Sequence, residues 1–238
     1  MVTKNATMTT KANVSNHPVL AHKLSILRSS ETDPATFRRV LREITFYLGY
    51  EATQTLATRN VDISTPIAQC VGKKLDERVA LVPIMRAGLG MVDPMLELLP
   101  NADVHHIGMY RVKETLLPIQ YYNKLPKVCT VDTAYILDPM IATAGTLTAV
   151  IAQLKKWGCP NIHVVSVLAS QAGLAVLSAA HPDVTVTVSA VDDVLSEKGY
   201  IIPGLGDAGD RLYTMANAEL DHDEKLLSPS KRKKSIDN

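Results

Sequence analysis

A run of small and hydroxylated residues between an apolar stretch and a helix-like segment is the first chemical signal in the chain. Residues 135–150 read Y-I-L-D-P-M-I-A-T-A-G-T-L-T-A-V, so a strand would end at Asp138 and a helix would begin near Gly145. The small side chains of residues 142–146 would let a phosphate approach the backbone. The helix would add free N–H groups and the positive end of its dipole. The pattern predicts a phosphate site, and an ordinary strand-to-helix turn that binds nothing is the alternative.

The aspartate at the end of the apolar run points to a further ligand group beside the phosphate. Ligands of open α/β sheets collect at the carboxyl ends of strands, where Asp138 is expected to lie. A carboxylate in that place could contact sugar hydroxyls or Mg²⁺. The loop matches neither G-x-x-x-x-G-K-[ST] nor G-x-G-x-x-G, so it is neither a P-loop nor a dinucleotide-binding signature.

Three segments, in this order along the chain, resemble uracil phosphoribosyltransferases. They are V-P-I-M-R-A-G-L-G at 82–90, D-P-M-I-A-T-A-G-T at 138–146 and G-Y-I-I-P-G-L-G-D-A-G-D at 199–210. The likeness covers about residues 17–213 and includes G-M-Y-R at 108–111. It implies an enzyme that makes UMP and pyrophosphate from uracil and phosphoribosyl pyrophosphate.

The resemblance also implies roles for individual residues. The residues expected to bind phosphoribosyl pyrophosphate are Arg86, Arg111, Asp138, Pro139, Met140, Ile141, Ala142, Thr143, Ala144, Gly145, Thr146 and Asp207. The residues expected to bind uracil are Ile201, Gly206, Asp207 and Ala208. Asp138 and Asp207 are the catalytic candidates. Mg²⁺ is the expected cofactor, held mainly by substrate and water with no direct side-chain ligand assigned.

The Gly- and Pro-rich segment 200–210 suits recognition of a flat base by backbone groups. Uracil presents an imide N–H between two carbonyls, an edge that one backbone acceptor between two donors would match. Cytosine would place its amino group against a donor and leave polar groups unpaired. No side chain in the matching segments is an obvious acceptor for the uracil proton, so water or the pyrophosphate would take it.

Two residues of the phosphate loop differ from those that many phosphoribosyltransferases carry. Ala144 stands where many relatives have glycine. The Cβ of alanine restricts positive φ at this position, although its small side chain should preserve the site. Many phosphoribosyltransferases carry two consecutive acids, whereas Pro139 follows Asp138 here, as it does in the uracil enzymes. Asp138 is therefore expected to support the ribose hydroxyls and the developing positive charge, and it is a weak candidate for a catalytic base.

Apolar strands that alternate with helices must position these residues. Strands are predicted at 79–85, 104–109, 135–137, 162–169 and 184–191. Helices are predicted at 34–58, 90–99, 146–157 and 170–180, with Gly49 marking a kink or break in the first. This order indicates an α/β fold, with a parallel sheet flanked by helices on both faces. The resemblance adds the type I phosphoribosyltransferase fold, a C-terminal hood over the active site and a β-arm, which we place at 109–128.

Composition indicates a soluble protein without a general affinity for polyanions. The chain has 238 residues, with 25 Lys and Arg against 24 Asp and Glu, so neither a nucleic-acid nor a membrane partner is expected. Three cysteines without C-x-x-C spacing (Cys70, Cys129 and Cys159) indicate a reducing compartment. The uncharged stretch 162–180 is interrupted by polar residues and fits a strand and a helix better than a membrane span. We expect a cytoplasmic protein.

Three regions are expected: a flexible segment at 1–16, a phosphoribosyltransferase domain at 17–213 and a flexible C-terminal extension at 214–238. The basic run Lys231–Lys234 is either a solvated tail or a nuclear address. Relatives with a β-arm associate, so a homodimer or homotetramer is expected, and GTP is a candidate allosteric activator. The alternative function is a regulator that kept the fold to sense nucleotides or bind RNA.

Overall fold

The computed structural model describes residues 12–111 and 118–214. Its helices are α1 (Pro18–Arg28), α2 (Pro34–Ala52), the 3-10 helix η1 (Ala87–Met91), α3 (Val92–Leu98), α4 (Gly145–Trp157), α5 (Gln171–Ala180) and α6 (Ala208–Tyr213). Its strands are β1 (Ala12–Val14), β2 (Thr58–Ser64), β3 (Gln69–Leu75), β4 (Val79–Met85), β5 (Asp103–Val104), β6 (Ile107–Arg111), β7 (Pro118–Asn123), β8 (Thr133–Leu137), β9 (Met140–Ile141), β10 (Asn161–Ser170), β11 (Thr185–Asp192), β12 (Val194–Leu195) and β13 (Ile201–Ile202).

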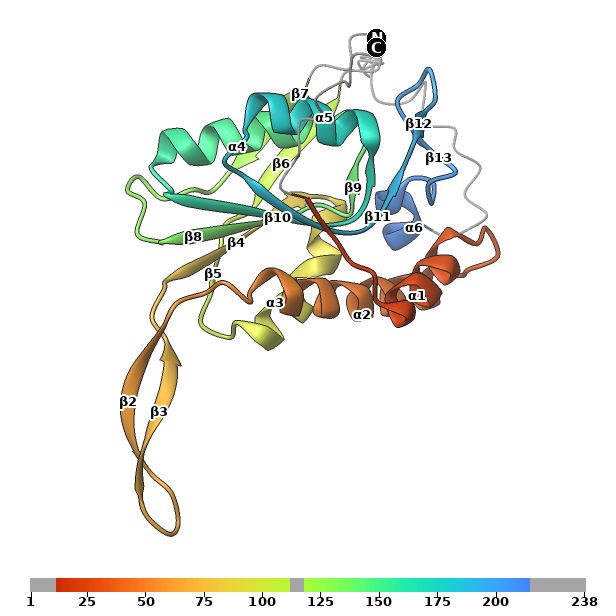
Figure 1. Ribbon diagram of the computed structural model, residues 1–238. Coiled ribbons are helices and arrows are strands. Elements are labelled where there is room, and N and C mark those ends of the chain that lie inside the picture. The colour runs from red at the N-terminus through yellow and green to blue at the C-terminus, as the bar shows by residue number, and fades with distance from the viewer. Residues whose placement is uncertain (1–11, 112–117, 215–238) are drawn as a thin grey trace, which may run out of the picture.

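A mostly parallel sheet forms the centre of the protein. Its strand order is β1-β11-β10-β8-β4-β6-β7, with β5 paired to β4 and β9 paired to β10. The pairs of β4 with β8, of β8 with β10 and of β10 with β11 are all parallel, whereas β7 returns antiparallel to β6. Figure 1 shows α1, α2 and α3 on one face of the sheet and α4 and α5 on the other. The expected α/β fold is confirmed.

The central strands are apolar along their whole length because helices cover both of their faces. Every residue of β8 is buried, and in β4 only Met85 is partly exposed. Leu81 and Leu137 pack towards α1, α2 and α3, while Val82 and Ile136 belong to the core beneath α4 and α5. Alternate residues of one strand therefore contribute to two cores, which explains why the sequence shows near-continuous apolar runs.

The structure corrects the helix expected at 34–58. One helix, α2, runs from Pro34 to Ala52 without a break, and the Asp33 carboxylate caps its N-terminus by accepting from the Ala35 and Thr36 N–H groups. Gly49 lies inside the helix, where a Cβ would collide with Met95 Sδ of α3. The glycine therefore allows close packing of two helices and does not end one of them.

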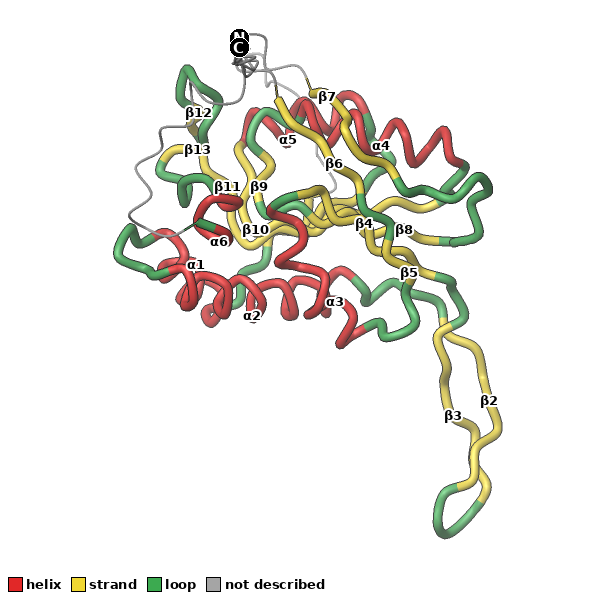
Figure 2. Tube along the Cα trace, turned by 180° about the vertical axis from the view of Figure 1, so that it is seen from behind, coloured by secondary structure: helices red, strands yellow, loops and turns green. Residues whose placement is uncertain are grey.

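The position expected for the β-arm is also wrong. The hairpin that projects from the body is β2–β3, whose strands pair antiparallel from Thr58↔Leu75 to Ser64↔Gln69; Figures 1 and 2 show it extending away from the sheet. The region expected at 109–128 instead contains most of β6 and all of β7, which extend the edge of the main sheet. Residues 112–117 of that region lie outside the described residues.

The start of the described chain belongs to the sheet. Within the segment 1–16 expected to be flexible, β1 pairs in parallel with β11 through Ala12↔Val186 and its two following pairs. Within residues 12–111 and 118–214, no helix is long and apolar enough to cross a membrane.

A buried histidine in the sheet makes stability depend on pH. His163 of β10 is 8% exposed, stacks on the Tyr135 ring at 5.4 Å and lies with Nε2 2.8 Å from Thr187 Oγ1. Burial lowers the pKa of His163 to about 4. Between that value and the ordinary pKa of 6.5, the unfolded chain binds a proton that the folded chain does not.

The free energy of unfolding should consequently fall as the pH falls from 6.5 towards 4, by up to about 3 kcal/mol from this residue. Urea unfolding of the wild type, His163→Gln and His22→Gln across this range measures the effect, because His22 is exposed. His163→Gln should flatten the pH dependence, and His22→Gln should leave it unchanged. An equal slope in all three proteins would contradict the assignment.

Candidate functional site

The carboxyl ends of β4 and β8 open into a cavity of about 820 Å³. Its walls come from residues 84–87, from β6, from the loop between β8 and α4, and from residues 197–201 and 206–209. All three segments that resemble the phosphoribosyltransferase pattern therefore reach one cavity. This is the edge of the sheet at which parallel α/β folds bind ligands.

The loop from Asp138 to Thr146 contributes to the cavity with only some of its residues. Asp138, Met140, Ala142 and Thr146 line it. The lining does not include Pro139, Ile141, Thr143, Ala144 and Gly145, and Ile141 and Ala144 are 1% and 2% exposed. α4 begins at Gly145, so its first N–H groups lie beside the loop, as a phosphate site requires.

Ala144 adopts the backbone conformation that its side chain disfavours. Its φ is 60° and its ψ is 1°, in the left-handed region. An L-residue with a Cβ pays about 1–2 kcal/mol for this region relative to the right-handed one. Ala144 takes up this conformation despite its Cβ. A neighbouring contact holds the loop: Ser170 Oγ donates to the Ala142 carbonyl at 2.6 Å and accepts from the Gly173 N–H at 2.8 Å.

Arg86 follows β4 and lies at the mouth of the cavity. Its Nη2 is 2.8 Å from Asp210 Oδ1, and its side chain is 56% exposed. Gly88 allows this position, because a Cβ there would collide with the Leu137 carbonyl oxygen at the end of β8. Parallel pairing of β4 with β8 brings Arg86 and Asp138 to the same edge of the sheet, and Asp138 lies at the carboxyl end of a strand as predicted. Arg111 ends β6, and its side chain lies outside the described part of the structure.

The segment expected to bind the base follows β12 and folds over the cavity. Ile201, Gly206, Asp207 and Ala208 all line the cavity. Asp207 is the N-cap of α6 and accepts from the Asp210 N–H at 2.9 Å. Positive φ values at three glycines, Gly199, Gly204 and Gly206, give this segment its turns. The four residues expected to bind uracil are thus held together.

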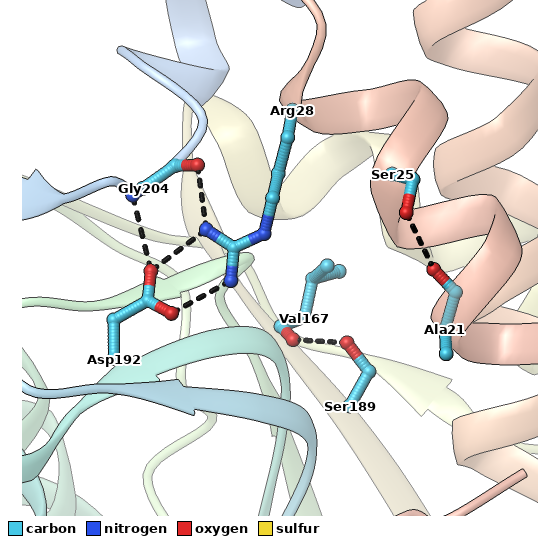
Figure 3. A network of polar contacts seen from close by, with 7 residues as sticks. All are labelled: Ala21, Ser25, Arg28, Val167, Ser189, Asp192 and Gly204. Atoms are coloured by element: carbon cyan, nitrogen blue, oxygen red, sulfur yellow. Dashed lines mark hydrogen bonds and ion pairs between the residues drawn. The ribbon is translucent and has the colours of Figure 1, made fainter.

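A partly buried ion pair fixes the base segment to the body of the protein. Arg28 at the end of α1 donates from Nη1 and Nη2 to the two carboxylate oxygens of Asp192, each at 2.7 Å (Figure 3). Nη1 also donates to the Gly204 carbonyl at 2.8 Å, and the Gly204 N–H donates to Asp192 at 3.0 Å. The Arg28 guanidinium lowers the pKa of Asp192.

A second arginine connects the end of the base segment to the first two helices. Arg211 donates to the Leu205 carbonyl at 2.9 Å and to the Ser29 carbonyl at 2.6 Å. Its guanidinium carbon also lies 4.4 Å from the centre of the Phe37 ring. The carbonyl groups of the segment and of the α1–α2 turn therefore share one cation, which aligns them.

Sequence reasoning missed several of these residues. Arg28 and Asp192 lie outside the matching segments and 164 residues apart, so no local pattern connects them. Lys198 lines the cavity and directly precedes the recognised segment 199–210, so its position next to that segment was the available signal. Tyr110 and Tyr200 also line the cavity; they lie inside the recognised segments 108–111 and 199–210 but were assigned no role.

Oxygen ligands for a hard cation are present but are not gathered into a metal centre. Asp138 and Asp207 line the same cavity from opposite segments. Among residues 12–111 and 118–214, no group of three or more His, Cys, Asp or Glu side chains could hold a metal ion.

Comparison with known proteins places the chain in a family. The family model for uracil phosphoribosyltransferase matches residues 14–215. A uracil phosphoribosyltransferase from Roseiflexus sp. (strain RS-1) is 48% identical over 200 residues, which are 84% of this chain and 96% of that protein. One from Streptococcus pyogenes serotype M5 (strain Manfredo) is 47% identical over 204 residues, which are 85% and 98% of the two chains.

Solved structures agree with these matches. The AQ2163 protein from Aquifex aeolicus superposes with a TM-score of 0.81 at 36% identity, covering 85% of this chain and 97% of that one. Adenine phosphoribosyl transferase from Trypanosoma brucei superposes with a TM-score of 0.52 at 13% identity, covering 80% and 87%, and shares the fold alone. Together with the cavity that its three characteristic segments form, these matches show that the chain belongs to the uracil phosphoribosyltransferase family.

Proposed function

We propose that this protein transfers the phosphoribosyl group of phosphoribosyl pyrophosphate to uracil, giving UMP and pyrophosphate. The observation that supports this most directly is the single cavity lined by Arg86, Asp138, Ile201 and residues 206–208. One space is therefore faced by a cation for the leaving group, a carboxylate for the sugar and a loop whose backbone groups would bind the base. Its volume of about 820 Å³ falls in the usual range for small-molecule sites.

The reaction replaces one bond at the anomeric carbon. The bond from this carbon to the pyrophosphate oxygen breaks with its electron pair, and a ring nitrogen of uracil forms the new bond. The nitrogen's proton goes to water or to the departing pyrophosphate. Arg86 stabilises the negative leaving group, while Asp138 stabilises the positive charge that develops on the ribose.

The proposal includes Mg²⁺, which would bind together with phosphoribosyl pyrophosphate. When bound, it would neutralise charge on the pyrophosphate. Asp138 and Asp207 both line the cavity and supply carboxylate oxygens, which suits a hard cation that keeps most of its water. In this arrangement Asp207 orients the donor while its own position is held by the α6 N–H of Asp210.

Recognition of the base by backbone groups predicts a specific pattern of substrates. 5-Fluorouracil keeps the imide edge of uracil and should react, whereas cytosine reverses one donor and acceptor and should be rejected by 10⁴-fold or more, on the order seen when buried polar groups lose their partners. Competition assays with both bases at saturating donor measure kcat/KM directly. Efficient turnover of cytosine would show that the assigned edge is wrong.

The test of the proposed function is an assay with labelled uracil, phosphoribosyl pyrophosphate and Mg²⁺. UMP and pyrophosphate should form in equal amounts, and chelation of Mg²⁺ should stop the reaction. Absence of UMP together with retained nucleotide binding would favour the regulator that senses nucleotides. Activation by GTP stays a prediction that the same assay measures.

The projecting β2–β3 hairpin supports a homo-oligomer. Its apolar side chains Ile67 and Val71 are 96% and 64% exposed, far from the cavity segments in Figure 2. We expect the wild type to sediment as a dimer or tetramer. Ile67→Ser with Val71→Ser should shift the distribution towards smaller species, while Val176→Ser on α5, also exposed, should not. Identical distributions would remove the hairpin from the interface.

A further inference from the structure

The Arg86 side chain at the mouth of the cavity is held by a residue that lies outside the cavity lining. Asp210 of α6 places Oδ1 2.8 Å from Arg86 Nη2, and the two side chains are 27% and 56% exposed. The lining ends at Gly209, so Asp210 does not face the substrate space. Whatever the Asp210 carboxylate contributes to the reaction therefore passes through Arg86.

The geometry leaves most of the guanidinium available. A guanidinium offers five N–H donors in a planar fork, and the carboxylate of Asp210 is within hydrogen-bond distance of Nη2 alone. Gly209 lies beside the same group, since a Cβ there would be 3.5 Å from Nη2 and 3.8 Å from Nε. One edge of the fork is thus fixed against α6, and the other N–H groups can bind pyrophosphate.

The same helix is joined to the residue expected to orient the donor. The Asp210 N–H donates to Asp207 Oδ1 at 2.9 Å, so consecutive contacts run from Asp207 through Asp210 to Arg86. A long arginine side chain that is half exposed has many rotamers in solution. The Asp210 carboxylate on the capped helix α6 restricts the rotamers of Arg86 before substrate binds.

We propose that Asp210 is a positioning residue that holds Arg86 in the orientation in which it binds pyrophosphate. The inference rests on the proposed function, because it assigns the leaving group to Arg86. Asp210 is expected to affect the binding of pyrophosphate and of the donor, and to have little effect on uracil once the donor is bound.

Asp210→Asn tests this without disturbing the helix. The substitution keeps the shape of the side chain, and the contacts of Asp210 with Asp207 and Thr214 use its backbone groups. We expect the KM for phosphoribosyl pyrophosphate and the Kd for pyrophosphate to rise about 5- to 20-fold, the range that one charge-assisted hydrogen bond covers. The KM for uracil at saturating donor should stay within twofold. Asp210→Glu, which keeps the charge, should recover part of the loss.

A double-mutant cycle supplies a readout that a merely structural role would not produce. In Arg86→Gln, the further change Asp210→Asn should have no effect on the Kd for pyrophosphate, because its only route of action is gone. Asp183→Asn is the matched control, since Asp183 forms an exposed ion pair with Lys155 at 2.6 Å away from the cavity. It should behave as wild type.

Calorimetric binding of pyrophosphate separates this inference from the proposed function. A wild type that makes no UMP would overturn the proposed function, whereas the inference is judged by pyrophosphate binding in the same protein. Additive losses in the double variant, or an unchanged Kd in Asp210→Asn, would overturn the inference. Tighter binding in Asp210→Asn would also overturn it, by showing that the carboxylate competes with the anion.

Discussion

Replacing Arg86 with alanine should lower kcat/KM for phosphoribosyl pyrophosphate by about 100- to 1,000-fold, the range found when one preorganised group that stabilises transition-state charge is removed. Arg86 lines the cavity together with Asp138, which follows the neighbouring parallel strand. Its loss would leave the departing pyrophosphate without a charge-assisted and often bidentate partner. Both donor affinity and turnover should fall, because charge on the leaving group increases in the transition state.

Steady-state kinetics with varied donor and saturating uracil measure this effect. Arg86→Lys should recover only part of the activity, since an ammonium cannot form the planar fork. Arg39→Ala is the control, because Arg39 is exposed on α2 and pairs with Glu43. Unchanged kinetics of Arg86→Ala at subsaturating donor would rule out the assigned role.

Replacing Arg28 with methionine should destabilise the protein by about 2–4 kcal/mol, somewhat less than the loss for a fully buried ion pair, because Arg28 is 24% exposed. Asp192 is 9% exposed and would lose the cation that satisfies both of its oxygens. Gly204 would lose an anchor at the same time. The base segment should therefore become less ordered, and the KM for uracil should rise as well.

Urea unfolding and uracil kinetics at saturating donor test both parts of this prediction. The free energy of unfolding should fall in Arg28→Met and should not fall in Arg39→Met, whose arginine pairs with a carboxylate on the surface. Adding Asp192→Asn to Arg28→Met should restore part of the stability, because it removes the unpaired charge. A fall in stability with an unchanged KM for uracil would show that the ion pair does not hold the base segment.

The elements that the sequence predicts well are those with a strong local pattern. β4 lies at its expected bounds, 79–85, because a strand covered on both faces is apolar at nearly every position. β2 and β3 show no such run, since they have no buried face: most of their side chains are exposed. Gly49 misled the helix prediction because a glycine that allows close packing looks the same in sequence as one that ends a helix.

The candidate site also has features that the sequence predicts and features that only tertiary contacts determine. Arg86 and Asp138 follow apolar strands, and parallel pairing of β4 with β8 brings the ends of those strands together, so their proximity is predictable. The bonds that hold the base segment depend on tertiary contacts. Arg28 contacts Asp192 only after α1 packs against the end of β11, and no local sequence pattern in either segment predicts this ion pair.

The contacts of the base segment with the first helices also set the order in which the protein can become functional during synthesis. Arg28 bonds to the Gly204 carbonyl 176 residues later, and Arg38 donates to the Leu212 carbonyl at 2.7 Å across 174 residues. A nascent chain that has reached the end of β11 contains every strand of the main sheet, yet it lacks residues 197–201 and 206–209, which line the cavity. The chain must be synthesised as far as α6 before these contacts between the two ends of the domain can form. Chains released earlier should be partly folded and should form no UMP. Long-range closure of this kind is slow relative to local helix formation, so maturation of the domain should wait on residues 193–214, which follow β11.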